Sequence, residues 1–150
     1  MKKVHIGIVD SVIDESCLVV MPSNIYGAMI GENSFIGPFT EIQTGVIIGK
    51  SVRIQSHSFI CSGVEIGDNT FVGHGVVFIN DPFSDGGPAR GDSSKYRKTL
   101  IGENVSIGSN ATILPVSICA NVVIGAGAVV TKNITSEGVY LGNPAKKSRK

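Results

Sequence analysis

The chain has 150 residues, the size of one ordinary domain, and we expect a single domain over residues 1–150. Thirteen basic and twelve acidic residues give a net charge of +1, so nothing favours binding to nucleic acid or to a membrane surface. Three cysteines without a CxxC pair support neither a disulfide framework nor a zinc knuckle. With no apolar run of membrane-spanning length, we expect a cytoplasmic protein.

The first thirty residues are less regular than the rest of the chain. Val12 and Leu18 are separated by the six-residue step that recurs later, but Asn24 stands at the next position, where an aliphatic residue is expected. Terminal repeats are commonly atypical because they cap the stack. We therefore predict that this segment is an end coil, with Val12 and Leu18 in register with the later repeats.

A ladder with a period of six begins at Ile30. Each ladder residue is followed four positions later by a small or β-branched residue, and glycine often follows directly. A period of six fits a short flat strand and a sharp corner, so three repeats close one coil of eighteen residues, and stacked coils bury a continuous aliphatic core. The ladder residues are Ile30, Ile36, Ile42, Ile48, Ile54, Ile60, Ile66, Val72 and Phe78, and their partners are Ser34, Thr40, Val46, Val52, Ser58, Val64, Thr70 and Val76.

The ladder stops after Phe78 and resumes at Ile101, which leaves a long excursion at about residues 80–99. Loops of this length are usually functional. The period continues to Ile113, but Ile118 follows after only five residues, so one residue is missing at Leu114-Pro115-Val116.

The Ile-Gly-x-x-x-x hexads, the stretch Gly125–Lys132 and the closing Gly142-Asn143-Pro144-Ala145-Lys146 resemble the hexapeptide-repeat acyltransferases. This resemblance implies an all-β, left-handed parallel β-helix, a homotrimer, and acetyl-CoA as co-substrate bound between neighbouring subunits. We therefore expect one β-helix with a single long loop extruded at about residues 80–99.

Phe78–Pro82, Lys95–Ile101 and Ala111–Pro115 resemble the N-acetyltransferases of nucleotide-linked 3-amino sugars. The activity that this resemblance implies is acetylation of an amino group on a dTDP- or UDP-linked sugar, in bacterial surface-polysaccharide (lipopolysaccharide) synthesis. Alternatives on the same fold are an O-acetyltransferase or another small-molecule acetyltransferase, a γ-carbonic-anhydrase-like metal protein, and a β-helix without catalysis. Three zinc-binding histidines in register are absent from the sequence, and we expect no metal.

Acetyl transfer to an amine benefits from a base, and histidine is suited to that role near neutral pH. His57 and His74 are seventeen residues apart, almost one coil, so we expect both at one corner on successive coils as candidate catalytic residues. Asn80 and Asp81 lie at the next corner, where the resemblance places a substrate-binding pair. The alternative for all four is an ordinary role in turns and loop starts.

The remaining candidates are binding residues. Arg90 and Arg97 could bind the diphosphate of a nucleotide sugar, and Tyr96 could stack on its base or pack the loop. For acetyl-CoA we predict small corner residues near the C-terminus that let the pantetheine chain approach the backbone, and two lysines for the phosphates. These cofactor-binding candidates are Ser109, Ala111, Ala126, Gly127, Lys132 and Lys146.

Overall fold

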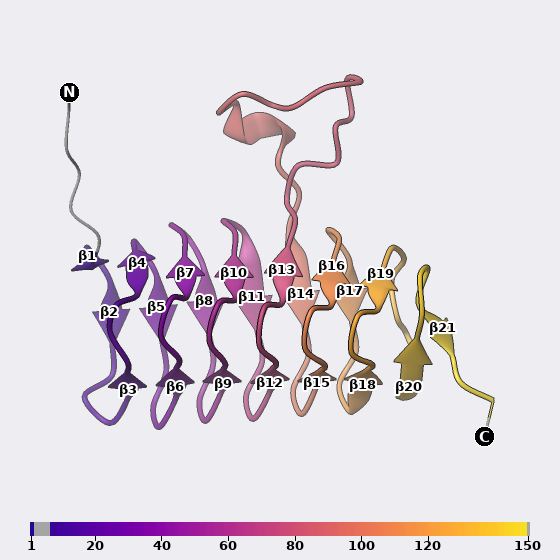
Figure 1. The fold of residues 1–150 in the computed structure, drawn as a ribbon, viewed down its shortest axis with the longest axis horizontal. Helices are drawn as coiled ribbons and strands as arrows, with labels where there is room; N and C mark the ends of the chain where they lie inside the picture. Colours follow the sequence, from indigo (N-terminus) through magenta and orange to yellow (C-terminus); the bar gives the residue numbers. More distant parts are fainter. Residues whose placement is uncertain (2–6, 150) are drawn as a thin grey trace.

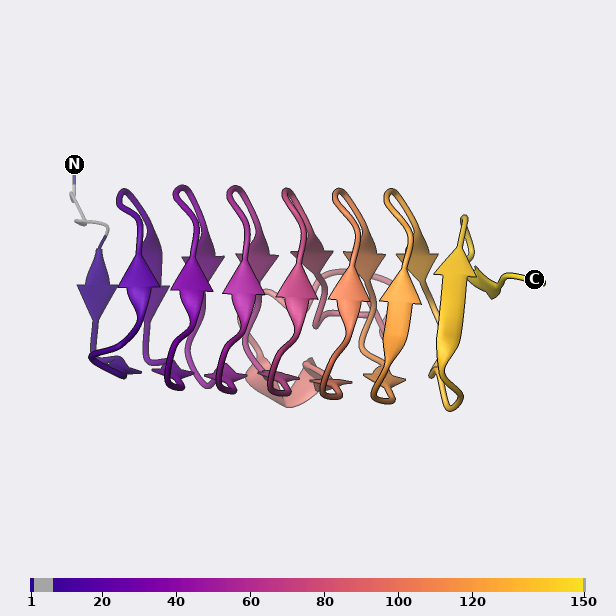
Figure 2. The same ribbon diagram turned by 90° about the horizontal axis from the view of Figure 1, so that it is seen from below.

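The computed structural model describes residue 1 and residues 7–149, and His5 therefore lies outside the described part of the chain. Three sheets of very short parallel strands form the faces of a triangular prism (Figures 1 and 2). The chain passes from face A to face B to face C in each coil and then begins the next coil. The fold class expected from the sequence, an all-β left-handed parallel β-helix with one extruded loop, is confirmed.

From β1 to β19, the strands of each face follow one another at every third position in chain order, and β20 and β21 are added to the last of the three faces. Face A contains β1 (Ile8–Val9), β4 (Asn24–Tyr26), β7 (Glu41–Ile42), β10 (Phe59–Ile60), β13 (Val77–Phe78), β16 (Thr112–Ile113) and β19 (Val129–Val130). Face B contains β2 (Val12–Ile13), β5 (Met29–Ile30), β8 (Ile47–Ile48), β11 (Val64–Ile66), β14 (Thr99–Ile101) and β17 (Ser117–Ile118). Face C contains β3 (Leu18–Val19), β6 (Phe35–Ile36), β9 (Arg53–Ile54), β12 (Phe71–Val72), β15 (Ser106–Ile107), β18 (Val122–Ile124), β20 (Gly138–Leu141) and β21 (Lys146–Lys147).

The six-residue ladder forms the core of the prism. Ile42 pairs with Ile60, and Ile48 pairs with Ile66, so identical side chains stack from coil to coil. Every ladder residue from Ile30 to Phe78 is buried, and so is every one of its small partners. Because each strand is hydrogen-bonded to the coils above and below it, stacking satisfies the backbone while it removes aliphatic surface from water.

Polar members of the core are satisfied by carbonyl groups at the corners. Ser58 Oγ donates to the carbonyl of Gly73 at 2.9 Å, and Thr70 Oγ1 donates to that of Gly102 at 3.0 Å. A buried hydroxyl without such a partner would cost about 1–3 kcal/mol. Serine and threonine therefore fit the small positions of the repeat as well as valine does.

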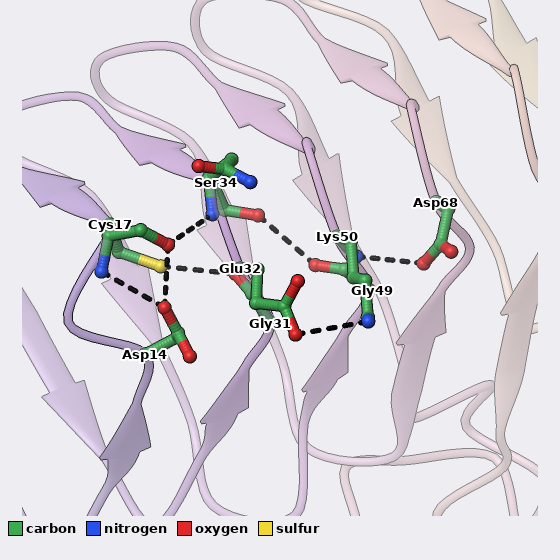
Figure 3. A network of polar contacts seen from close by, with 10 residues as sticks. Asp14, Cys17, Gly31, Glu32, Ser34, Gly49, Lys50 and Asp68 are labelled. Atoms are coloured by element: carbon green, nitrogen blue, oxygen red, sulfur yellow. Dashed lines mark hydrogen bonds and ion pairs between the residues drawn. The ribbon is translucent and has the colours of Figure 1, made fainter.

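A polar network links successive coils at the corner between faces B and C (Figure 3). The backbone amide of Lys50 donates to Asp68 Oδ1 at 2.7 Å, and Lys50 Nζ lies 3.0 Å from Glu32 Oε1. One coil earlier, Cys17 Sγ donates to the carbonyl of Gly31 at 3.0 Å. The carboxylate of Glu32 raises the pKa of Lys50, but the pair is exposed, and exposed ion pairs contribute little to stability.

The register predicted for the N-terminal coils is wrong by one residue. Val12 is 69% exposed, and Ile13, not Val12, pairs with Ile30 on the inner side. In the same way, Ile25 is buried in the position that the sequence pattern gave to Asn24. The reason is a shortened corner, because only five residues separate Ile25 from Ile30. Counting backwards in sixes from Ile30 therefore shifted every earlier position outwards.

The three edges of the prism differ in how much their lengths vary. At the B–C edge and at the C–A edge, the inward residues on the two sides of the edge are six positions apart in every coil. Examples are the step from Ile66 to Val72 and the step from Val72 to Phe78. The A–B edge varies instead: the step is six from Ile60 to Ile66 but twenty-three from Phe78 to Ile101. It is five from Ile113 to Ile118, so the residue predicted to be missing there is missing from the A–B edge.

The long loop leaves the prism at this A–B edge, between β13 and β14, and stands away from the body (Figure 1). Its one regular element is a short 3-10 helix, Ser93–Lys95, which Asp92 caps. At the C-terminal end, β20 and β21 pair antiparallel and close face C. Within the described residues, no helix has the length and apolar character needed to span a bilayer.

Candidate functional site

Both candidate histidines lie on the C–A edge, exposed, on successive coils. The backbone ladder fixes their register: His57 N donates to the carbonyl of Pro38, and Gly75 N donates to that of Ser56. His74 therefore stacks on Ser56 and not on His57, and the two imidazoles occupy neighbouring rows of one corner. The predicted shared corner is confirmed, whereas a catalytic role for either histidine stays a prediction.

The two imidazole rings have different partners. His74 Nδ1 is 2.8 Å from Ser56 Oγ, a hydrogen bond that holds the ring by one nitrogen and leaves Nε2 outside that contact. The ring of His57 stacks on Phe39, with centroids 4.9 Å apart and planes 29° apart. His57 also has a positive φ of 62°. Of the two rings, His74 has the arrangement that suits a base, since a second side chain orients it.

Asn80 and Asp81 hold the base of the long loop on the A–B edge. Asn80 Nδ2 donates to Ser62 Oγ at 2.8 Å and to the Ser62 carbonyl at 3.1 Å. The Asn80 carbonyl accepts from Arg97 N at 2.9 Å, which joins the two ends of the loop. Asp81 accepts from the backbone amides of Phe83 and Ala89, at 3.0 Å and 2.7 Å. Asn80 and Asp81 therefore hold the loop in place by hydrogen bonds, which was one of the two interpretations of this pair.

The four residues do not form one cluster within a single chain. His57 and His74 lie at one end of face A, and Asn80 and Asp81 lie at the other, with β13 between them. Six residues of extended chain from His74 to Asn80 span roughly 15–20 Å, which is too far for direct cooperation. A site that uses both ends of face A needs a second subunit.

A shallow pocket lies at the base of the loop. Its lining consists of Ser62, Gly63, Ser93, Tyr96, Arg97 and Lys98. Tyr96 is half-buried there, while Lys98 Nζ is 3.3 Å from Glu65 Oε1. Two of the predicted substrate-binding residues, Tyr96 and Arg97, thus line the same pocket as Ser62, which accepts a hydrogen bond from Asn80. Arg90 is exposed further out on the loop and does not line this pocket.

Three of the predicted cofactor-binding residues continue the histidine edge towards the C-terminus. Asn110 N donates to the His74 carbonyl, and Gly127 N donates to the Ser109 carbonyl, so Ser109 and then Ala126 and Gly127 follow His74 along the C–A edge. This gives a row of small residues next to an imidazole, half-buried at Ser109 and exposed at Ala126 and Gly127. Their contact with an acyl donor stays a prediction.

The other three cofactor-binding candidates do not belong to this row. Ala111 is fully buried and its amide donates to Gly108 O at 3.3 Å, so the expected contact of Ala111 with a ligand is wrong: its methyl group fills the core. Lys132 is exposed on the A–B edge next to Asn133, whose side chain accepts from Ser117 N. Lys146 is exposed on β21. Lys132 therefore does not lie on the C–A edge, whereas Lys146 pairs with Leu141 beside the C-terminal end of that edge.

Sequence reasoning missed a group of half-buried polar side chains that leads to Asn80. Tyr26 donates to Glu41 Oε1 at 3.0 Å, and Gln43 Nε2 donates to the same oxygen at 3.2 Å. Gln43 Oε1 in turn accepts from Ser62 N at 3.2 Å. The signal in the sequence is a set of polar residues at or just after strands of face A, but only the coil stacking brings them together.

No group of three or more His, Cys, Asp or Glu side chains that could bind a metal occurs in the described part of the chain. Cys61 is buried, and burial raises the pKa of its thiol to about 12. The expectation that the protein holds no metal stays a prediction.

Sequence profiles of two repeat families match separate stretches of the chain. Residues 27–62 match the bacterial transferase hexapeptide (six repeats), and residues 98–132 match the hexapeptide repeat of succinyl-transferase. The bifunctional protein GlmU of Streptococcus uberis is 33% identical over 142 residues, which are 90% of this chain and 31% of GlmU. The chain thus spans about a third of the length of the curated relatives it matches.

Solved structures with the same fold include several acetyltransferases. The acetyltransferase domain of PglB from Neisseria gonorrhoeae superposes with a TM-score of 0.66 at 21% identity, over 92% of this chain and 57% of that one. AntD from Bacillus cereus, an N-acyltransferase solved with dTDP and coenzyme A, gives 0.66 at 24%, over 95% and 81%. A maltose O-acetyltransferase from Clostridium difficile gives 0.57 at 27%, over 95% and 70%.

Proposed function

We propose that this chain, which is a hexapeptide-repeat β-helix of the kind found in acyltransferases, transfers the acetyl group of acetyl-CoA to the amino group of a nucleotide-linked amino sugar. The observation that carries the proposal is the single extruded loop at the A–B edge. Its base forms a pocket bordered by Tyr96, Arg97 and the residue that holds Asn80. The guanidinium can bind a diphosphate in a fork geometry, and Tyr96 offers a face to a base.

The acyl donor would lie along the C–A edge. Small residues there leave room for the pantetheine chain, and AntD, which shares the fold, was solved with both dTDP and coenzyme A. In this arrangement the thioester lies near His74 and the acceptor lies near Asn80. Because these edges are separated by face A within one chain, the working site combines the C–A edge of one subunit with the A–B edge of another, in a homotrimer.

The proposed chemistry has three requirements. The amine must be neutral, the developing oxyanion needs hydrogen-bond donors, and a proton must leave the tetrahedral intermediate. His74 Nε2 would accept that proton while Ser56 holds Nδ1. A positioned base contributes on the order of 10²–10⁴ to the rate. The setting would be bacterial surface-polysaccharide synthesis in the cytoplasm.

The direct experiment follows release of the free thiol from acetyl-CoA. The acceptors are dTDP- and UDP-linked amino sugars, with the same sugars unlinked and simple amines as controls. We expect turnover that requires the nucleotide. Turnover of unlinked acceptors alone would refute the nucleotide-sugar assignment.

The base is tested with His57→Asn and His74→Asn. We expect His74→Asn to lower kcat by at least 100-fold and His57→Asn to lower it by less than tenfold. Unchanged kcat in both variants would show that the substrate or the thiolate takes the proton. Metal analysis of the purified protein is a parallel control, because stoichiometric zinc would favour a carbonic-anhydrase-like protein.

A second candidate is O-acetylation of a sugar hydroxyl. It is favoured by the similarity to the maltose O-acetyltransferase, at 27% identity over 70% of that chain. The same thiol assay separates the two, with maltose and other free sugars as acceptors. Turnover of hydroxyl acceptors and none of amines would establish it.

A further inference from the structure

A chain of hydrogen bonds, most of them between side chains, runs beside the A–B edge from the second coil to the base of the loop. It begins at Tyr26 and passes through Glu41 and Gln43 to Ser62, which holds Asn80. Tyr26, Glu41, Gln43, Ser62 and Asn80 are all half-buried. Tyr26 and Glu41 lie on β4 and β7, and Gln43, Ser62 and Asn80 follow β7, β10 and β13 at the A–B edge, so the path crosses several coils of the prism.

The backbone fixes the direction of every bond in this path. Ser62 N can only donate, so Gln43 must present Oε1 to it and turn Nε2 towards Glu41. The carboxylate of Glu41 can only accept, and it receives both Gln43 and the hydroxyl of Tyr26. Burial first, and then the bond to Glu41, raise the pKa of Tyr26 further above neutrality, which agrees with its role as the donor.

The backbone of Ser62 also fixes the orientation of Asn80. The Ser62 carbonyl can only accept, so the carboxamide of Asn80 must turn Nδ2 towards it. Oδ1 then lies on the opposite side of the carboxamide. No described residue donates to Oδ1, and none of the described side-chain oxygens is both buried and unpaired, so Oδ1 is accessible from outside.

We propose that Gln43 and Ser62 are positioning residues that lock Asn80 with Oδ1 facing the acceptor, so that the site selects a ligand carrying an N–H or O–H donor at that point. A neutral amine that donates to Oδ1 keeps its lone pair free for attack. A carboxylate or phosphate oxygen at the same point would be repelled. This inference rests on the proposed function, because it assumes that the acceptor binds beside Asn80.

The first test removes the central link with Gln43→Leu. Gln55→Leu is the matched control, since Gln55 is also half-buried, follows an isoleucine at the end of its strand and has no side-chain hydrogen bond in the described structure. We expect Gln43→Leu to raise KM for the acceptor about fivefold, the usual weight of one hydrogen bond, and to leave KM for acetyl-CoA unchanged. An equal rise in both KM values, or equal effects of both variants, would overturn the proposal.

The second test needs no activity. In NMR spectra of the isotope-labelled protein, the side-chain NH₂ of Asn80, assigned by its loss in Asn80→Ala, should exchange slowly with water. We expect exchange at least tenfold faster in Gln43→Leu and in Ser62→Ala, but not in Gln55→Leu. Unchanged exchange would overturn the relay even if acetyl transfer is found. Faster exchange without turnover of any acceptor would uphold the relay and refute the proposed function instead.

Discussion

The C–A edge and the A–B edge border the same face of the prism, yet they follow opposite rules. Along the C–A edge, each step between inward residues is six, and the backbone of one coil rests directly on the next. Along the A–B edge, steps of five, six and twenty-three occur in one chain. The comparison shows that two uniform edges are enough to keep the coils in register, which leaves the third edge free to change.

The two edges differ in how closely the backbones of neighbouring coils approach each other. At the C–A edge, an added Cβ on Gly73 would lie 2.6 Å from Ser109 N and 2.8 Å from Ile107 O, so the coils touch backbone to backbone. At the A–B edge, an added Cβ on Gly45 would meet nothing within 4 Å, and one on Gly27 would collide first with the side chain of Thr44 and not with a neighbouring backbone. An insertion at the open edge therefore leaves the stacked strands in place.

The largest effect that we predict concerns the reactivity of a cysteine thiol. It tests where the A–B edge ends and the core begins. Cys61 follows Ile60 at the start of the A–B edge, but its thiol is buried and its pKa is raised to about 12. Because the thiolate is the reactive form, we expect Cys61 to react with a thiol reagent at pH 8 about a thousandfold more slowly than an ordinary cysteine with a pKa of about 8.5. Mass spectrometry of the labelled native protein checks this. Equal labelling of Cys61 and the half-buried Cys119 would show that the corner is open.

The next prediction compares the two edges by adding one methyl group to each. Gly73→Ala forces two backbones apart, and we expect a loss of about 2–3 kcal/mol in the free energy of unfolding. Gly45→Ala meets open space and carries only the strain of its positive φ of 74°, about 1 kcal/mol. Urea denaturation measures both values. A larger loss for Gly45→Ala would contradict the distinction between the edges.

A third prediction reverses the hydrogen bond that anchors the loop. Asn80→Asp places a carboxylate oxygen against the Ser62 carbonyl, where Nδ2 now donates. We expect a loss of about 1–2 kcal/mol in stability, and protease cleavage of the loop should become faster, because two acceptors face each other. Asn69→Asp, at an exposed corner of the B–C edge, is the control. Loop cleavage at the wild-type rate in Asn80→Asp would show that the bond to Ser62 does not hold the loop.

The smallest effect on stability is expected for the largest change in sequence. Replacing residues 81–97 with a four-residue turn should change the free energy of unfolding by less than about 1 kcal/mol, since a long loop costs little more to close than a short one. The same variant should lose all turnover of the acceptor. A cooperative unfolding transition at a much lower urea concentration would show that the loop is part of the folding unit.

Much of this molecule could be predicted from the sequence because the repeat is local. The ladder from Ile30 to Phe78, the buried partners such as Val46 and Thr70, and the loop between β13 and β14 are all as predicted. The N-terminal register failed because the five-residue corner between Ile25 and Ile30 carries no strong signal. Ala111 was misassigned because its small size suits a surface corner as well as the core, and burial alone separates the two.

The sequence by itself determined the coil, since a period of six with aliphatic residues can bury its apolar side only by stacking. Only the tertiary structure decided which residues of different coils meet. It placed His74 on Ser56, separated the histidines from Asn80 by the width of face A, and joined Gln43 to Ser62, nineteen positions along the chain. Such contacts depend on coil length and on the direction of each hydrogen bond, which a one-residue change at a single corner is enough to alter.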